Sequence, residues 1–235
     1  MDRDYNISVA MATFNGEKYI KEQLDSILVQ LNKNDEVIIS DDGSTDNTVS
    51  IINSYNDSRI KLINGTHNGI KKNFENAINN CNGKYIFLSD QDDIWEPNKI
   101  NKVLETFNKY HCSCVIHDCV VFNSDNNEII YNSFFSFRKS KKGIIKNIIK
   151  NSYIGCCMAI NSDIKDKILP IPNDIYMHDQ WIGLICEKNN GSIFINDKLI
   201  RYRRHNNTVT NLKHNSILKM IKYRYKLLLN LRRFK

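Results

Sequence analysis

The chain has 235 residues, of which 41% are hydrophobic and 25% are charged, so it is long enough for one large globular domain. This composition excludes a collagen-like chain, a disordered chain and a small disulfide scaffold. The net charge of +7 is uneven, because eight Lys or Arg and no acid follow residue 211, which leaves 25 basic against 26 acidic residues before it. The seven cysteines suit reduced thiols, and we expect neither a signal peptide nor a membrane span.

The first 110 residues alternate between two kinds of pattern. Short apolar runs predict strands at 7–12, 36–40, 60–63 and 85–88. Apolar residues at helical spacing predict helices at 17–31, 44–55 and 70–78, and a further helix that begins at Pro97. Repeated units of this kind predict a Rossmann-like α/β fold, with a mostly parallel central sheet and helices on both faces.

The second half is less regular. We expect a hairpin from 115–122 and 128–131, helices at 143–150 and 179–187, and strands at 155–160, 192–195 and 199–203. No clear linker precedes residue 211. The sequence therefore predicts one domain over 1–211, with halves 1–110 and 111–211, followed by a C-terminal helix over 212–235.

Polar clusters follow three of the predicted strands, where parallel sheets bind ligands. Asp90-Gln91-Asp92-Asp93 places three carboxylates within four residues, which repel one another unless a cation lies between them. Such oxygen ligands suit Mg²⁺ or Mn²⁺, although an acidic turn with a helix cap is the alternative. Asp42 follows the second strand and can accept a hydrogen bond from a nucleotide base or ribose, or form part of a tight turn.

Three motifs in this order and spacing carry a resemblance. The segments 8–16, 40–46 and 88–95 resemble the family 2 inverting glycosyltransferases of the GT-A fold. The form Ser-Asp-Gln-Asp-Asp-Ile-Trp at 89–95 is similar to bacterial rhamnosyltransferases and to capsule and O-antigen transferases. The resemblance covers about residues 5–210 and implies that 1–110 binds a nucleotide sugar while 111–211 binds the acceptor.

The resemblance also implies roles for the residues of the first half. Thr13, Phe14, Asn15 and Asp42 would line the pocket for the nucleotide base, and Asp90 would lie near the ribose and the metal. Asp92, the last residue of the Asp-x-Asp motif, would ligate Mn²⁺ or Mg²⁺, which neutralises charge on the departing diphosphate.

In the second half, the family's Glu-Asp pair at a helix start corresponds to His178-Asp179. The resemblance implies that Asp179 is the base that takes the acceptor proton, although it can also act only as a helix cap. The segment 201–210 resembles the family's closing segment, so His205 would reach the metal or diphosphate unless it is structural. Arg203 or Arg204 would contact phosphate.

The C-terminal segment combines apolar residues at helical spacing with a basic face. This pattern predicts an interfacial helix on anionic lipid. The alternatives are a helix that packs on the domain or on an oligomer partner, and a basic tail that binds nucleic acid. No nucleic-acid motif accompanies it, so we expect no nucleic-acid partner. The apolar residues are Ile217, Leu218, Ile221, Tyr225, Leu228 and Leu229, and the basic residues are Lys219, Lys222, Lys226 and Arg233.

We therefore expect a cytoplasmic enzyme, peripheral on the inner face of the membrane, that uses a UDP- or dTDP-sugar, with dTDP-rhamnose among the candidates. Its acceptor would be an oligosaccharide or lipid-linked sugar in bacterial surface polysaccharide synthesis. A sugar nucleotidyltransferase would need a basic Gly-rich loop after the first strand, which Thr13-Phe14-Asn15-Gly16 does not provide. The other rival is a catalytically weak, transferase-like scaffold. This alternative is disfavoured because the chain keeps Asp90, Asp92, Asp179 and His205.

Overall fold

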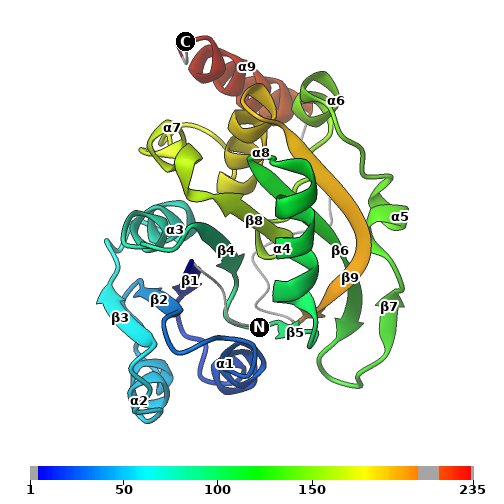
Figure 1. Cartoon of the computed structure of the whole chain (residues 1–235). Coiled ribbons are helices and arrows are strands. Elements are labelled where there is room, and N and C mark those ends of the chain that lie inside the picture. Colours follow the sequence, from blue (N-terminus) through cyan, green and yellow to red (C-terminus); the bar gives the residue numbers. More distant parts are fainter. Residues whose placement is uncertain (1–4, 206–216, 234–235) are drawn as a thin grey trace.

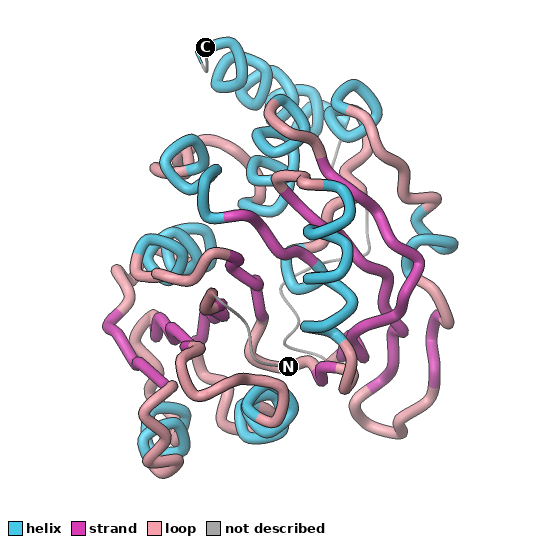
Figure 2. The backbone as a smooth tube through the Cα atoms, in the orientation of Figure 1, coloured by secondary structure: helices cyan, strands magenta, loops and turns pink. Residues whose placement is uncertain are grey.

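The computed structural model describes residues 5–205 and 217–233, and in it one mixed sheet carries helices on both faces (Figure 1). The tube view in Figure 2 shows the strands as a curved layer between the helices. The strands follow the order β3-β2-β1-β4-β8-β6-β9-β5, and β7 pairs with β6. They are β1 (Ile7–Thr13), β2 (Glu36–Asp41), β3 (Ile60–Asn64), β4 (Tyr85–Ser89), β5 (Ile94–Trp95), β6 (Cys114–Asn123), β7 (Ile129–Tyr131), β8 (Met158–Asn161) and β9 (Ser192–Arg204).

The helices of the first half connect the parallel strands, as the sequence predicts. Within the described residues no helix is long and apolar enough to cross a membrane. The helices are α1 (Ile20–Leu28), α2 (Thr48–Asn53), α3 (Ile70–Asn79), α4 (Lys99–Tyr110), α5 (Phe134–Arg138), α6 (Ile144–Ile149), α7 (Lys165–Ile168), α8 (His178–Lys188) and α9 (Ile217–Arg233), with 3₁₀ turns at Gly155–Cys157 and Ser162–Ile164.

The strands β3, β2, β1 and β4 are parallel, and β1, β2 and β4 are buried along their whole length. Strands that are covered on both faces read as continuous apolar runs, which explains why they are plain in the sequence. Because they are parallel, their carboxyl ends meet at one edge. The polar clusters after β1, β2 and β4 therefore lie together.

The second half extends the same sheet. β8 runs antiparallel between β4 and β6, and β6 pairs in parallel with β9. The predicted hairpin is confirmed as β6 and β7. The two strands expected at 192–195 and 199–203 are one strand, β9, because Asn196 and Asp197 are absorbed where the register with β6 shifts between His117 and Asp118.

The C-terminal helix α9 packs on the domain through one face. Leu227 and Leu231 are buried, and Lys188 of α8 donates from Nζ to the carbonyl oxygen of Leu231 at 3.1 Å. Asn230 donates to Asp174 at 2.8 Å. Other apolar side chains of α9 remain exposed, so the helix has a docked face and an open face.

Candidate active site

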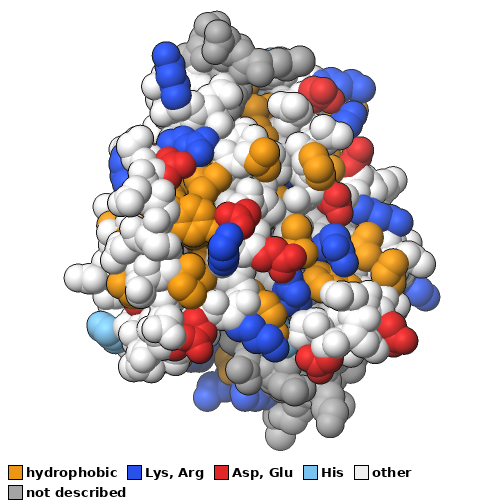
Figure 3. Space-filling model, turned by 90° about the horizontal axis from the view of Figure 1, so that it is seen from below, with side chains coloured by type: hydrophobic (Ala, Val, Ile, Leu, Met, Phe, Trp, Pro, Cys, Tyr) orange, Lys and Arg blue, Asp and Glu red, His pale blue; other side chains and the backbone are white. Residues whose placement is uncertain are grey.

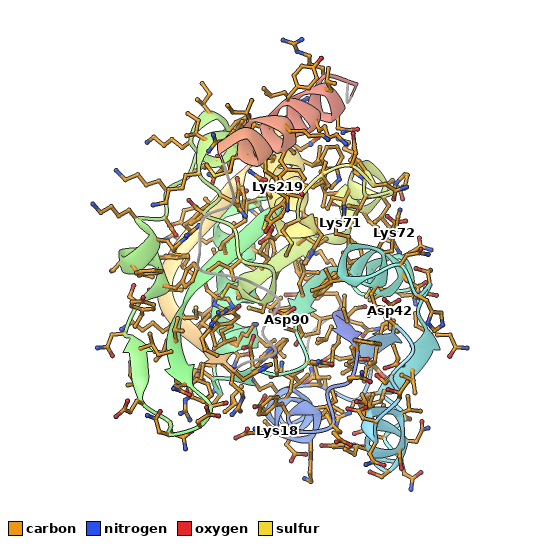
Figure 4. The ribbon with its side chains drawn as sticks, turned by 180° about the vertical axis from the view of Figure 1, so that it is seen from behind. Lys18, Asp42, Lys71, Lys72, Asp90 and Lys219 are labelled. Atoms are coloured by element: carbon orange, nitrogen blue, oxygen red, sulfur yellow. The ribbon has the colours of Figure 1, made fainter. Side chains whose placement is uncertain are left out.

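A cavity of about 810 Å³ opens at the carboxyl ends of β1, β2 and β4, a size typical of small-molecule sites. Figure 4 shows Asp42 and Asp90 on this side of the sheet, with Lys18 from the segment before α1. The structure brings together most of the residues that the sequence singled out. The cavity wall includes Thr13, Phe14, Asn15, Asp42, Asp90, Asp92 and His205, together with Lys18, Tyr19, Gly69, Ile70, Asn73, Gln91 and Asp125.

The loop after β1 is held open by hydrogen bonds to its neighbours. Gln91 accepts from the N–H of Phe14 at 2.9 Å and donates to its carbonyl oxygen at 3.0 Å. A Cβ atom at Gly16 would lie 2.3 Å from Gln91 Oε1, so glycine is required there for this clamp. Asn15 has a φ of 50° and accepts from the N–H of Thr45 at 2.8 Å. Phe14 itself is 53% exposed at the cavity, so its ring is free to meet a ligand.

Asp42 lines the cavity and carries an acceptor that has no described partner. Its Oδ2 accepts from the N–H of Gly69 at the start of α3, at 2.8 Å. Its Oδ1 is buried and has no hydrogen-bond partner among the described residues. Asn73 has the same character: its Nδ2 donates to the carbonyl oxygen of Thr13 at 3.0 Å, and its buried Oδ1 has no described partner. Such orphaned acceptors need a donor from elsewhere, and a ligand in the cavity can provide one.

The Asp90–Asp93 turn gathers negative charge. Burial, and then the neighbouring charge of Asp92, raises the pKa of Asp90 to about 7. His205 Nε2 lies 2.8 Å from Asp92 Oδ2, and the His205 ring lies against Tyr19, with ring centroids 4.8 Å apart. Two carboxylates and an imidazole on one wall form a donor set that fits a divalent cation.

A second cluster lies beneath this wall. One ligand atom each from Asp90, Asp93 and Cys156 falls within a 4.8 Å group. Asp93 and Cys156 are buried and do not line the cavity, and Asp93 Oδ1 already accepts from the N–H of Arg203 at 2.9 Å. Burial raises the pKa of the Cys156 thiol well above its usual value, so the thiol is neutral. A hard cation is therefore better served by Asp90, Asp92 and His205.

Arg203 lies behind the cavity wall. Its Nε donates to the carbonyl oxygen of Asp92 at 2.7 Å, and its guanidinium also pairs with Glu22. The guanidinium carbon lies 4.7 Å from the ring centroids of both Tyr19 and Phe122. Only 6% of Arg203 is exposed. These contacts use the guanidinium to fix the Asp92 turn against β9.

Asp179 is the second residue of α8 and does not line the cavity. A Cβ at Gly155 would lie 3.9 Å from Asp179 Cβ, and the next residue, Cys156, groups with Asp90, so the two carboxyl groups lie in one region of the fold. Burial raises the pKa of Asp179 to about 7, against the opposing effect of hydrogen bonds from the Gln180 N–H at 2.5 Å and from Asn151 Nδ2 at 3.3 Å. A carboxyl group with this pKa can exchange a proton near neutral pH.

His178 turns away from the polar site. Its ring stacks on Phe74 with centroids 4.1 Å apart, and both ring nitrogens are buried without a described partner. Burial lowers the pKa of His178 to about 3, so the ring is neutral. A Cβ at Gly155 would lie 2.8 Å from His178 Nε2, which explains the glycine at that position. A neutral His178 gives Asp179 neither a like charge nor a counter-ion beside it in the chain.

Several contributors were not predicted from the sequence. Gln91 supports the loop after β1, and Tyr19 supports the His205 ring. Asn73 donates to the carbonyl oxygen of Thr13, and Asn151 donates to Asp179. Gln91 lies inside the acidic motif, which is a usable signal. The other three belong to helices or loops in which nothing local marks them.

The chain resembles several known proteins. Residues 8–169 match the family described as Glycosyl transferase family 2. The dTDP-rhamnosyl transferase RfbG of Shigella flexneri is 34% identical over 223 residues, covering 84% of this chain and 72% of that protein. The UDP-Glc:alpha-D-GlcNAc-diphosphoundecaprenol beta-1,3-glucosyltransferase WfgD of Escherichia coli is 28% identical over 216 residues, covering 89% of this chain and 81% of that protein.

Solved structures share the fold. TarS 1–349 of S. aureus in complex with UDP-GlcNAc superposes with a TM-score of 0.73 at 18% identity, covering 96% of this chain and 67% of that one. The mannosyltransferase PcManGT of Pyrobaculum calidifontis, in complex with GDP-Man and Mn²⁺, superposes with a TM-score of 0.64 at 19% identity. The match covers 82% of this chain and 55% of that one. The expected GT-A fold is confirmed. With the family match over most of its length, the chain belongs to glycosyl transferase family 2 and is a glycosyltransferase.

Proposed function

We propose that this chain is a metal-dependent, inverting glycosyltransferase that moves a sugar from a UDP- or dTDP-sugar to a glycan or lipid-linked acceptor in bacterial surface polysaccharide synthesis. The observation that carries the proposal is the gathering of Asp42, Asp90, Asp92 and His205 around one cavity, with Asp179 near the Asp90–Cys156 group. The names of two relatives support both nucleotides, since one is a dTDP-rhamnosyl transferase and the other uses UDP-Glc.

The donor base would bind between the loop after β1 and the start of α3. Asp42 Oδ1 would accept from a base N–H, which relieves its lack of a partner. The exposed Phe14 ring would pack on the base. Thr13 and Asn15 would hold this loop in place through their bonds to Asp41 and Thr45.

The diphosphate would lie near the Asp90–Asp92 turn. Asp92 and His205, together with Asp90, would hold Mn²⁺ or Mg²⁺. When bound, the ion supplies positive charge that stabilises the departing nucleoside diphosphate. Arg203 would position Asp92 through the hydrogen bond to its backbone, and it would not contact phosphate directly.

Asp179 would act as the general base. In its ionised form it would take the proton from the acceptor hydroxyl as that oxygen attacks the anomeric carbon, and a single displacement inverts the configuration there. Asn151 and the Gln180 N–H would orient the carboxylate through their hydrogen bonds. The pKa of about 7 keeps a useful fraction ionised at neutral pH while the group remains basic.

We also propose that the enzyme works at the cytoplasmic face of the membrane. All seven cysteines are free thiols, which suits a reducing compartment. The open face of α9 carries exposed Ile221, Tyr225 and Leu228. This face would rest on anionic lipid, close to a lipid-linked acceptor.

A donor-hydrolysis screen tests the proposal. Purified protein is incubated with UDP-, dTDP- and GDP-sugars in Mn²⁺, Mg²⁺ or EDTA, and nucleotide release is recorded. We expect metal-dependent release from one donor that is lost in Asp92→Asn and Asp179→Asn and kept in Asp163→Asn, which changes an exposed carboxyl far from the motifs. If calorimetry detects no nucleotide-sugar binding with metal present, the proposal is wrong.

A further inference from the structure

Two segments far apart in the sequence share the end of the molecule at which α9 lies. α6 and α9 run close together (Figure 1), and Arg224 of α9 donates to the carbonyl oxygen of Ile149 in α6. Both helices also contact α8, the helix that carries Asp179. We call the exposed side chains of these two helices the α6–α9 surface.

The α6–α9 surface is unusually apolar. Ile145 and Ile149 of the short helix α6 are 75% and 59% exposed. On α9, Ile221, Tyr225 and Leu228 are 55%, 62% and 41% exposed and are spaced to form one stripe along the helix. Single exposed apolar residues are ordinary, but several gathered on adjoining helices indicate a surface that contacts something apolar.

The same surface is basic in both of its segments. No Asp or Glu occurs between Glu128 and Asp163, and α9 contains none either. Figure 4 shows Lys219 on α9. Figure 3, which views the end away from α9, shows acidic and basic side chains mixed. The basic residues of the surface are Lys146 in α6 and Lys219, Lys222, Arg224, Lys226 and Arg232 in α9; Lys150 directly follows α6, and Arg138, Lys139, Lys141 and Lys142 precede it in the chain.

We propose that the α6–α9 surface docks on an anionic lipid bilayer and that α6 is a second insertion element beside α9. The apolar side chains of both helices enter the boundary between headgroups and acyl chains, while the lysines around them stay at the lipid phosphates. The absence of acids from both segments matches an anionic surface better than it matches a protein partner, whose surface carries both signs.

The position of α6 gives this docking a purpose. Gln180 of α8 donates from Nε2 to the carbonyl oxygen of Asn147 in α6 at 2.7 Å, and Asn151, just after α6, donates to Asp179 at 3.3 Å. A bilayer held by α6 therefore lies near the proposed base, where a lipid-linked acceptor arrives. This purpose rests on the proposed function, whereas lipid binding itself is measured without any donor.

Flotation with vesicles tests the proposal. The full chain is mixed with vesicles of phosphatidylglycerol and phosphatidylcholine in equal parts, or of phosphatidylcholine alone. The test variant is the double substitution Ile145→Ser and Ile149→Ser, and its matched control is Ile129→Ser on β7, which removes an isoleucine that is 58% exposed. A charge variant, Lys146→Gln with Lys150→Gln, is compared with Lys33→Gln and Lys109→Gln, which are also exposed lysines.

We expect the protein to bind the phosphatidylglycerol vesicles, and both α6 variants to weaken that binding by about tenfold or more while the controls keep it. Donor hydrolysis in solution should be unchanged in the α6 variants, so that a failure of lipid binding and a failure of the proposed function give different results. Unchanged vesicle binding in both α6 variants would overturn the role of α6. Light scattering that shows a dimer, lost in Ile145→Ser with Ile149→Ser, would assign the surface to self-association.

Discussion

Arg203 donates from Nε to the backbone carbonyl oxygen of Asp92 at 2.7 Å, so a side chain of β9 holds the turn that presents the proposed metal ligand. Tyr19 and Phe122 enclose its guanidinium, and its backbone N–H is bound by Asp93. His205 lies two residues further along and contacts the Asp92 side chain. One short stretch of chain thus positions Asp92 and supplies His205, two of the three residues of the proposed metal site.

The Arg203→Lys variant tests this positioning role. Lysine keeps the charge but cannot match the planar fork between the two rings, so the Asp92 turn loses its support. We expect the Mn²⁺ concentration for half-maximal donor hydrolysis to rise by about tenfold. Arg201→Lys is the control, since Arg201 lies on the same strand with its guanidinium 4.6 Å from the Phe122 centroid. An unchanged Mn²⁺ requirement would show that Arg203 does not position the proposed metal ligand Asp92.

Asp42→Asn tests base recognition. Asp42 uses one oxygen to accept from the Gly69 N–H, and its second, buried oxygen would accept from the base, whereas asparagine has only one oxygen for both. One of the two N–H donors then faces an amide NH₂, and we expect calorimetry to show about tenfold or more weaker binding of UDP or dTDP. The control Asp163→Asn should bind normally. Equal affinity in the two variants would contradict the assignment.

Asp179→Asn tests the general base. We expect the rate of transfer to acceptor to fall by about a hundredfold or more while nucleotide affinity is kept. In the wild type, log kcat/KM should decline below an apparent pKa near 7, because protonation removes the base. A pH profile that is flat from acid to neutral pH, or a variant that keeps its rate, would leave Asp179 as a helix cap.

The same carboxyl group affects stability. Its pKa is raised from 3.8 in the unfolded reference to about 7 in the fold, so folding favours the protonated form. Ionising Asp179 in the fold therefore lowers the free energy of unfolding. This loss is absent below the lower pKa and grows as pH rises between the two values. Above the higher pKa it is constant, at on the order of 4 kcal/mol at most. Urea unfolding should therefore show Asp179→Asn to be more stable than wild type, by a margin that increases from acid to neutral pH. A constant margin would contradict the shift.

His178 allows a test of the departure from the family's Glu-Asp pair. The ring is stacked on Phe74 with both nitrogens buried and without a described partner. His178→Glu would bury an unpaired charge, and we expect it to lower the free energy of unfolding by about 3 kcal/mol or more. His111→Glu, at an exposed position after α4, should have little effect. Equal stability of the two variants in urea unfolding would mean that His178 is solvated.

The alternating half of the fold is readable from sequence because each strand is buried on both faces and each helix shows one apolar stripe. Six elements of this half lie within a few residues of their predicted ranges: β1, β2, β3, β4, α3 and α4. The short elements α5 and α7 and the two-residue β5 were not predicted, since they are too short to show a period. Gly155 begins a 3₁₀ turn, so the strand expected from 155 starts only at Met158.

The candidate site was predictable where its residues sit in motifs at strand ends, as Asp42 and Asp90 do. Its supports were not, because Tyr19, Asn73 and Asn151 reach the site only through contacts between distant elements. The placement of Arg203 follows the same logic. Its charge suggested phosphate, and only the packing of β9 against the Asp92 turn shows what the guanidinium touches.

The antiparallel strand β8 has a consequence for how two substrates meet. It belongs to the second half and pairs with β4 of the first half, and β5 of the first half pairs with β9 of the second, so two ladders join the halves and leave no hinge between them. Rotating one half against the other would break both ladders, which is costly in a buried sheet. The sheet therefore holds the half that carries Asp90 in a fixed relation to the half that carries Asp179 on α8, and acceptor choice is left to segments outside the sheet, which can vary without disturbing that relation.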